Sequence, residues 1–219
     1  MKNLWKKFIK QQYEYHFPAV KIPVKKTKED YYNNKYPKKN ISYKRTDRNS
    51  TLNIDVRQFL NHHNYELMEI VGVDDDEVAY ESLMYVMDNI KYTPDKKQYG
   101  MNEYWCFNYE TLNSKKGDCE DGAILLYSLM RKNGIPAWKI RLNAGNVKGG
   151  GGHAYLVYYV ESKKKWVVLD WCYWPNTFAV DKRKEYKKET NYHDVWFSWN
   201  EDYAWSEGLN KKAEELLNS

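Results

Sequence analysis

The sequence predicts an α+β fold in which helices pack on one antiparallel β-sheet. Two observations predict it: apolar residues recur at helical spacing in segments 74–93 and 118–133, and three segments after residue 136 alternate with a period of two. Helices that precede the strands favour α+β over an alternating α/β arrangement. With 219 residues, the chain is long enough for one substantial domain and an added arm.

The first helix is predicted between Asp74 and Pro94. The run "DDDE" at its start suits the positive end of a helix dipole, and proline cannot continue a helix. The spacing of its apolar residues indicates that one side of the helix is buried. That side comprises Ala79, Leu83, Val86, Met87 and Ile90.

The stretch "GDCEDGAILLYSLMRKNGIPA" predicts the second helix. Asp118 can cap the free N–H groups at its start, and Asp121 is placed as the reciprocal acid of a capping box. Gly134 and Pro136 end the helix. Cys119 therefore lies in the first turn among acids, whereas a buried cysteine normally has apolar neighbours.

Three strands follow, in "AWKIRLNAG", "HAYLVYYV" and "KWVVLDW", and the polar turn "ESKKK" joins the second to the third. If this turn centres on Ser162 and Lys163, Asp170 lies opposite Tyr155 and diagonal to His153 on the same face. Diagonal neighbours stand about 7–8 Å apart, which allows a carboxylate to reach an imidazole. A shift of one residue would place Asp170 on the other face.

The regions outside this core are predicted to be an arm and an extension. Residues 1–73 form a basic, largely irregular N-terminal arm with a short helix near Val56 to Asn61, residues 74–180 form the catalytic core, and residues 181–219 form a C-terminal extension that packs on it. A short helix is predicted around Lys211 to Leu217. The extension supplies aromatic residues and then charged ones.

Charge is distributed unevenly along the chain. The first fifty residues contain 14 Lys/Arg and 4 Asp/Glu, a net charge of +10, and the remainder contains 21 and 26, a net charge of −5. Such an arm can bind an acidic partner or nucleic acid, although a solvated segment explains the charge equally well.

Cysteine usage and hydropathy limit the cellular compartments in which we expect the protein. The three cysteines form no C-x-x-C pair, so the sequence signals neither a disulfide framework nor a thiolate zinc site. No apolar run is long enough for a signal peptide or a membrane span. We therefore expect a reducing compartment, either cytoplasmic or virion-associated.

Three residues have the types and contexts needed for thiol chemistry. A nucleophilic cysteine needs a base and a group that orients the base. Cys119 begins a helix, which favours a thiolate, whereas the adjacent acids oppose it. His153 follows the glycine run "GGGG", whose use is conformational freedom or close approach at a cleft. Asp170 is the candidate orienting acid, and a purely structural role for Cys119 is the alternative.

These motifs carry a family resemblance. "GDCEDGAILLYSLMRKNGIPA", "GGHAYLVYYV" and "WVVLD" resemble the Cys, His and Asp motifs of the transglutaminase-like superfamily. The upstream "NIKYTPD" and "NEYWCFNYETL" resemble its bacterial and phage cysteine proteinase branch. The resemblance covers roughly residues 74–174 and implies a papain/transglutaminase-like core.

The resemblance also implies roles for individual residues. It makes Cys119 the acyl-accepting nucleophile, His153 the general base and acid, and Asp170 the residue that orients His153. No cofactor is required for this chemistry. The substrate is a peptide or protein amide, and the acyl group passes to water or to an amine.

Two further sites follow from the same resemblance. Trp105 matches a position that helps to bind the oxyanion, although a core role is the stronger expectation for a tryptophan and the Cys119 backbone N–H is the safer donor. The next residue is Cys106, where glutamine is expected in that branch. Glu120 and Asp121 are candidate calcium ligands, but two adjacent carboxylates fall short of a calcium site.

The sequence leaves two functions open. The first is a transglutaminase-like cysteine peptidase or amidase, with composition compatible with a phage source, in which hydrolysis is favoured over crosslinking because nothing announces an amine-acceptor site. The second is a catalytically silent protein of the same fold that acts as a structural or binding protein, for example a virion component.

Overall fold

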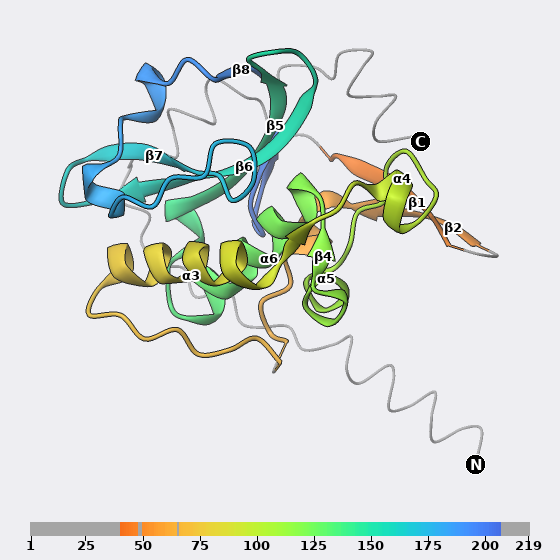
Figure 1. The fold of residues 1–219 in the computed structure, drawn as a ribbon, viewed down its shortest axis with the longest axis horizontal. Helices are drawn as coiled ribbons and strands as arrows, with labels where there is room; N and C mark the ends of the chain where they lie inside the picture. Colours follow the sequence, from red (N-terminus) through yellow and green to blue (C-terminus); the bar gives the residue numbers. More distant parts are fainter. Residues whose placement is uncertain (1–39, 48–49, 65, 207–219) are drawn as a thin grey trace.

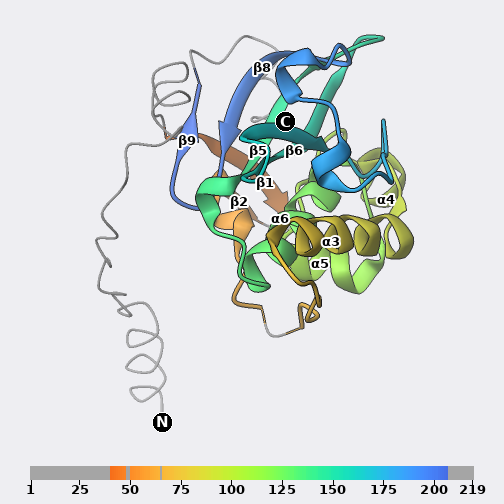
Figure 2. The same cartoon turned by 90° about the vertical axis from the view of Figure 1, so that its left-hand side faces the viewer.

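A five-stranded antiparallel sheet with helices on one side forms the centre of the protein (Figures 1 and 2). The computed structural model describes residues 40–47, 50–64 and 66–206. The strand order is β7-β6-β5-β8-β9, and neighbouring strands are antiparallel. The bounds are β5 Ile140–Val147, β6 Gly152–Val160, β7 Lys165–Leu169, β8 Tyr192–Trp199 and β9 Ala204–Trp205. The α+β prediction is confirmed.

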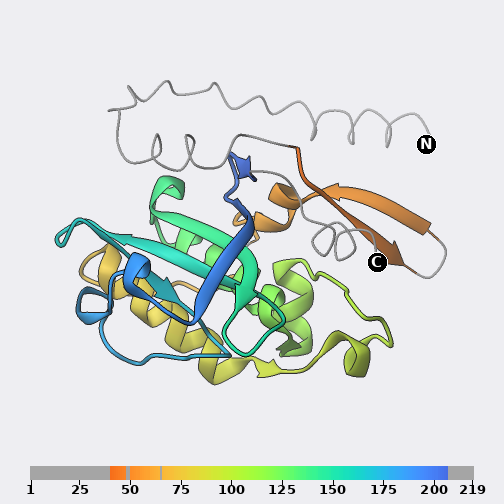
Figure 3. The same cartoon turned by 90° about the horizontal axis from the view of Figure 1, so that it is seen from above.

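The helices form a second layer. Helix α6 packs on β5 and β6, and α3 and α5 pack against α6 (Figures 2 and 3). The short strands β3 and β4 pair in parallel between these helices. The bounds are α3 Asp75–Asn89, β3 Lys91–Tyr92, α4 Asp95–Gln98, α5 Asn108–Ser114, β4 Lys116–Gly117 and α6 Cys119–Lys132. No helix within the described residues has the length and apolar character needed to cross a bilayer.

The two predicted helices begin at their predicted caps. Asp74 caps α3 and accepts a hydrogen bond from the Glu77 N–H (2.9 Å). Asp118 is the N-cap residue of α6, and its N–H donates to Asp121 Oδ2 (3.4 Å), as a capping-box acid would accept it. Cys119 is therefore the first residue of α6.

The predicted register between β6 and β7 is confirmed. Leu156 faces Leu169, which is the pairing obtained when the turn centres on residues 162 and 163. The glycine run forms the turn between β5 and β6, and residues 149–151 have φ values of 91°, 85° and 106°. Residues that carry a side chain rarely adopt such φ values, so glycine is needed to make this turn.

The structure differs from the prediction near the start of the described chain. The strands β1 (Ser42–Asp47) and β2 (Ser50–Asp55) pair in antiparallel fashion, and a 3-10 turn η1 (Val56–Leu60) follows at the predicted short helix. Tyr43 stacks on Trp105 at a centroid distance of 5.0 Å, and Arg45 forms an ion pair with Glu110 (2.6 Å). These long-range contacts order a segment whose local pattern is irregular. Residues 1–39 lie outside the described residues.

The C-terminal part also differs from the prediction of an extension that packs on the core. Strand β8 pairs with β5 inside the main sheet, so residues 192–199 are part of the core itself. The pairing is interrupted by bulges at Gly145, where a Cβ atom would lie 2.9 Å from the Asp194 carbonyl oxygen. The helix predicted around Lys211 to Leu217 lies outside the described residues.

Candidate active site

Cys119 is held at the start of α6 by Trp171, which follows the end of β7. The indole N–H of Trp171 donates to the Cys119 carbonyl oxygen (3.1 Å). Trp171 can approach this closely because residue 122 is glycine: a Cβ atom there would lie 2.2 Å from the Trp171 ring. The glycine of "CEDG" therefore fixes the position of the thiol.

The surroundings of Cys119 keep its thiol protonated. Burial raises its pKa well above the usual value, and the negative charge of Asp118 raises it further. The backbone N–H of Ala154 acts in the opposite direction. The thiol donates a hydrogen bond to Glu120 Oε2 (3.3 Å). Burial and the charge of Asp118 thus act against a thiolate at this helix start, and compensation of the Asp118 charge would favour one.

His153 and Asp170 form a buried pair. His153 Nε2 lies 2.9 Å from Asp170 Oδ2, and both side chains are fully buried. Because a carboxylate only accepts, Nε2 carries the proton and Nδ1 is left as the acceptor. Nδ1 is buried and has no hydrogen-bond partner. It is therefore the nitrogen available to take a proton.

Asp170 is kept ionised despite its burial. Burial alone would raise its pKa, but the hydrogen bond and charge of His153, together with backbone N–H groups, hold the pKa below the usual value. The N–H groups of Cys172 (3.0 Å) and Tyr173 (3.1 Å) reach Oδ1, and that of Trp174 (3.2 Å) reaches Oδ2. The Tyr192 hydroxyl also donates to Oδ2 (2.9 Å).

One cavity of about 180 Å³ brings the predicted residues together. Cys119 and His153 both line it, and Tyr92 and Tyr173 lie at its half-exposed side. The Tyr173 ring stacks on the His153 imidazole, with centroids 4.0 Å apart and planes 6° apart. Cys119 and His153 thus lie at one cavity.

Comparisons with known proteins concern the family and the fold. The family model of the transglutaminase-like superfamily matches residues 69–171. This segment belongs to the transglutaminase-like superfamily.

Solved structures resemble the transglutaminase-like domain at low sequence identity. Legionella pneumophila LapG has a TM-score of 0.50 and 19% identity over 66% of this chain and 77% of its own. Its calcium-bound form has a TM-score of 0.47 and 19% identity over 68% and 80%. No curated protein matches the chain.

An acidic cluster lies beside Cys119, and three of its members line the same cavity as Cys119 and His153. It comprises Asp95, Glu103, Asp118, Glu120 and Asp121, whose oxygens form groups lying within 4.8 Å of one another. Burial and the charge of Asp118 raise the pKa of Asp95 to about 7 and that of Glu103 to about 8. Burial, followed by the same charge, raises the pKa values of Glu120 and Asp121 well above the usual range. No lysine or arginine in the described part of the chain forms an ion pair with these five residues.

The oxygens of the acidic cluster fit a hard divalent cation. Asp95 Oδ1, Asp118 Oδ1 and Glu120 Oε1 are buried without a hydrogen-bond partner. Calcium and magnesium prefer carboxylate oxygens of this kind, and calcium accepts irregular geometry. The candidate ligands Glu120 and Asp121 are thus joined by three carboxylates that the sequence pattern does not single out. Asp95 and Glu103 have no local signal, because β3, β4 and the loop before α5 bring them to the helix start.

Trp105 lines the cavity, and its indole N–H already has a hydrogen-bond partner. Its Nε1 donates to Glu103 Oε1 (3.0 Å), and its ring is buried between Tyr43 and Trp199. Cys106 is fully buried, and its N–H donates to Asp121 Oδ1 (2.7 Å). Trp105 and Cys106 therefore support the wall of the site in this arrangement.

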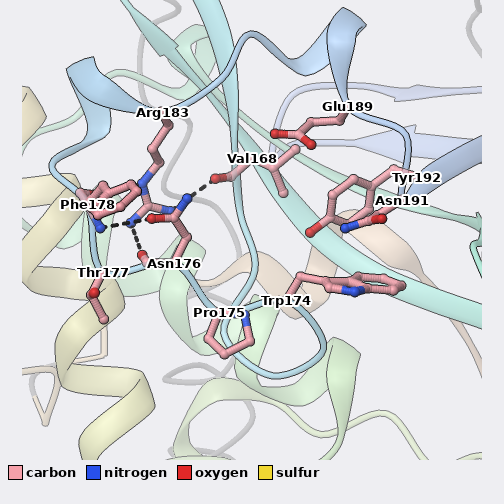
Figure 4. A pocket seen from close by; sticks show the side chains of 10 residues that line it. All are labelled: Val168, Trp174, Pro175, Asn176, Thr177, Phe178, Arg183, Glu189, Asn191 and Tyr192. Atoms are coloured by element: carbon pink, nitrogen blue, oxygen red, sulfur yellow. Dashed lines mark hydrogen bonds between the residues drawn. The ribbon is translucent and has the colours of Figure 1, made fainter.

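A second cavity of about 380 Å³ is lined by residues that include Val168, Trp174 and Tyr192 (Figure 4). Arg183 closes one side of it by donating to the carbonyl oxygens of Val168 (3.1 Å), Phe178 (3.0 Å) and Asn176. Tyr192 and Trp174 lie on the other side. Residues 174–191 are thereby held in place, and this loop leads to the strand that carries the Tyr192 hydroxyl.

Proposed function

We propose that the protein is a thiol peptidase or amidase that forms an acyl-enzyme on Cys119. The observation that carries the proposal is the pairing of His153 Nε2 with ionised Asp170, which leaves Nδ1 as a buried acceptor at the cavity of Cys119. Such an acceptor has no structural purpose in a core, where buried polar atoms are normally paired. It does have one as a general base.

The reaction would proceed in two acyl transfers. Cys119 attacks the carbonyl carbon of an amide while its thiol proton passes to His153 Nδ1. His153 returns the proton to the nitrogen of the leaving amine, and the C–N bond breaks to leave a thioester. Water then attacks the thioester, loses a proton to His153 and releases the thiol and a carboxylic acid. An amine in place of water would give a transamidated product.

The oxyanion needs donors at the start of α6. The Cys119 backbone N–H is the first candidate, because helix N-terminal N–H groups have no partner within the helix. Trp105 is a second candidate. Its indole N–H would have to break its hydrogen bond to Glu103 and donate to the oxyanion of the substrate instead.

Calcium is the proposed occupant of the acidic cluster. Asp95, Glu103, Asp118 and Glu120 would hold the ion, with Asp121 behind them. When bound, a divalent cation compensates the negative charge that raises the pKa of Cys119. The chain itself supplies the remaining steps through Cys119, His153 and Asp170.

A specific observation supports the silent alternative as well. Without compensation, the raised pKa of Cys119 leaves almost no thiolate at neutral pH. A protein that lacks turnover and binds a partner would show such a thiol under all conditions.

Alkylation with iodoacetamide separates these functions. The wild type, His153→Ala and Cys119→Ala are treated at neutral pH with calcium or with EGTA, and the labelled cysteines are mapped by mass spectrometry. The enzyme requires fast labelling of Cys119 with calcium that is lost in His153→Ala. Buried Cys106 serves as an internal control. Equal slow labelling of all thiols under both conditions would exclude the enzyme.

Product analysis then defines the reaction. A peptide library is incubated with the protein in H₂¹⁸O, with and without a primary amine. Incorporation of ¹⁸O into new carboxyl groups identifies hydrolysis, and incorporation of the amine identifies transamidation. Cys119→Ala is the blank.

The basic segment at residues 1–39 remains a separate prediction. Its expected acidic partner or nucleic acid is tested by a salt titration of nucleic-acid binding with the full chain and a chain lacking these residues. Binding that is absent, or indifferent to salt, would exclude nucleic acid.

A further inference from the structure

Tyr192 occupies a special position beside the triad. It is the first residue of β8 and pairs with Val147 at the end of β5. Its ring lies between those of Tyr155 (4.4 Å) and Trp174 (5.5 Å), measured between centroids. Figure 4 shows Tyr192 and Trp174 together on one side of the second cavity. The ring is thus fixed by packing, which fixes the direction of the hydroxyl.

The hydroxyl reaches the oxygen that His153 uses. Tyr192 donates to Asp170 Oδ2 at 2.9 Å, and His153 Nε2 lies 2.9 Å from that same oxygen. The other donors to Asp170 are the backbone N–H groups of residues 172–174. Among the bonds seen in the described residues, Tyr192 is therefore the one side chain other than His153 that contacts the carboxylate.

The phenol keeps its proton under all relevant conditions. Burial raises the pKa of Tyr192 far above the usual value, and the charge of Asp170 raises it further. A phenol that stays neutral donates a charge-assisted hydrogen bond, and such bonds are about twice as strong as neutral ones. The bond favours the ionised carboxylate and restrains its rotation about the bond to Cβ.

We propose that Tyr192 is a positioning residue that holds Asp170 ionised and aligned with His153. This inference rests on the proposed function and adds a fourth residue to it, supplied by a strand outside the matched segment 69–171. Tyr192 acts through Asp170 and does not contact the reacting atoms.

The test compares two tyrosines that each lose one buried phenol–carboxylate bond. Tyr192→Phe removes the hydrogen bond to Asp170. Tyr158→Phe removes the hydrogen bond between Tyr158 on β6 and Asp76 on α3 (2.7 Å). We expect Tyr192→Phe to slow labelling of Cys119 by iodoacetamide in calcium about tenfold, because a hydrogen bond to a charged group is lost. Tyr158→Phe leaves the labelling rate unchanged.

A spectroscopic readout is independent of turnover. In protein labelled with ¹⁵N-histidine, the Nε2 proton of His153 is assigned by its absence in His153→Ala. Loss of the Tyr192 hydroxyl is expected to shift this proton and speed its exchange with water about tenfold. Tyr192→Met, which also lacks a hydroxyl, is the second variant if Tyr192→Phe does not fold.

The outcomes separate the two proposals. Unchanged labelling and an unchanged Nε2 proton in Tyr192→Phe would overturn the role of Tyr192, as would equal effects of Tyr192→Phe and Tyr158→Phe. If wild-type Cys119 is unreactive in calcium and insensitive to His153→Ala, the proposed function fails. The Nε2 proton alone then decides whether Tyr192 positions the His153–Asp170 pair.

Discussion

Asp170 and the acidic cluster are buried or partly buried carboxylates of one site with opposite pKa shifts. Asp170 accepts hydrogen bonds from two side chains and three backbone N–H groups, and its pKa is lowered. The acidic cluster leaves three oxygens without a donor, and its pKa values are raised. Burial is common to both, so the supply of donors and positive charge decides the difference. Asp170 is thus fully supplied with donors, whereas the acidic cluster is where we propose that a cation binds.

The largest expected effect comes from removing the charge of Asp170. Asp170→Asn keeps the size of the side chain but removes its charge and lets His153 adopt the other tautomer. We expect the rate constant for peptide cleavage to fall roughly 1,000- to 10,000-fold, as for loss of the acid in other triads. Asp88→Asn on the exposed face of α3 is the control. A fall of less than threefold would show that Asp170 does not orient the base.

The next prediction concerns the acidic cluster and the dependence of the free energy of unfolding on pH and calcium. The pKa values of Asp95 and Glu103, about 7 and 8, lie above their ordinary values of 3.8 and 4.5. The folded state therefore binds more protons than the unfolded state in this window, and the free energy of unfolding falls as the pH rises from 5 to 8. Calcium at 100 times its Kd should restore about 3 kcal/mol at pH 8.

Calorimetry at pH 5 and pH 8, with calcium or EGTA, measures this effect. The calcium-dependent rise in Tm should be large at pH 8 and small at pH 5, where protons occupy the carboxylates. A rise of equal size at both pH values, or none at pH 8, would refute the assignment of the cation to the acidic cluster.

A third prediction concerns Trp171, which follows Asp170 in the chain and contacts the start of α6 beside the acidic cluster. Gly122→Ala introduces a Cβ atom that would lie 2.2 Å from the Trp171 ring, which donates to the Cys119 carbonyl oxygen. Overpacking of this kind costs about 2 kcal/mol. The free energy of unfolding is measured by urea denaturation, with alkylation of Cys119 as the local readout. Unchanged stability and labelling would mean that Trp171 does not fix the thiol.

The contrast also explains what could be predicted from sequence. The cap and the periodicity of α6 place Cys119 at the helix start, and counting from one hairpin turn pairs His153 with Asp170. Both steps use short-range geometry. Tyr192 reaches Asp170 across an irregular loop, and Glu103 reaches Glu120 through tertiary packing, so neither contact leaves a periodic signal.

Larger elements follow the same rule. The helices α3 and α6 carry apolar residues at helical spacing and agree with their predictions. Strand β8 and the paired strands β1 and β2 escape prediction because their partners lie far away in sequence: β8 pairs with β5, and Tyr43 packs on Trp105. The aromatic residues of this chain thus organise structure that local periodicity does not report.

The smallest expected effect comes from removing one charge from the acidic cluster. Glu103→Gln retains a carbonyl oxygen for the Trp105 indole N–H (3.0 Å in the wild type) but lowers the charge of the acidic cluster by one. At pH 8 in EGTA we expect the free energy of unfolding to rise by about 1 kcal/mol, because the variant no longer has to ionise a buried carboxyl group whose pKa lies above its ordinary value. In calcium the variant should gain less than the wild type, because one ligand is weakened. Exposed Glu69→Gln is the matched control, with the same chemical change outside the cluster. If Glu103→Gln is less stable than the wild type in EGTA, the carboxylates do not repel one another, and the contrast drawn with Asp170 would be wrong.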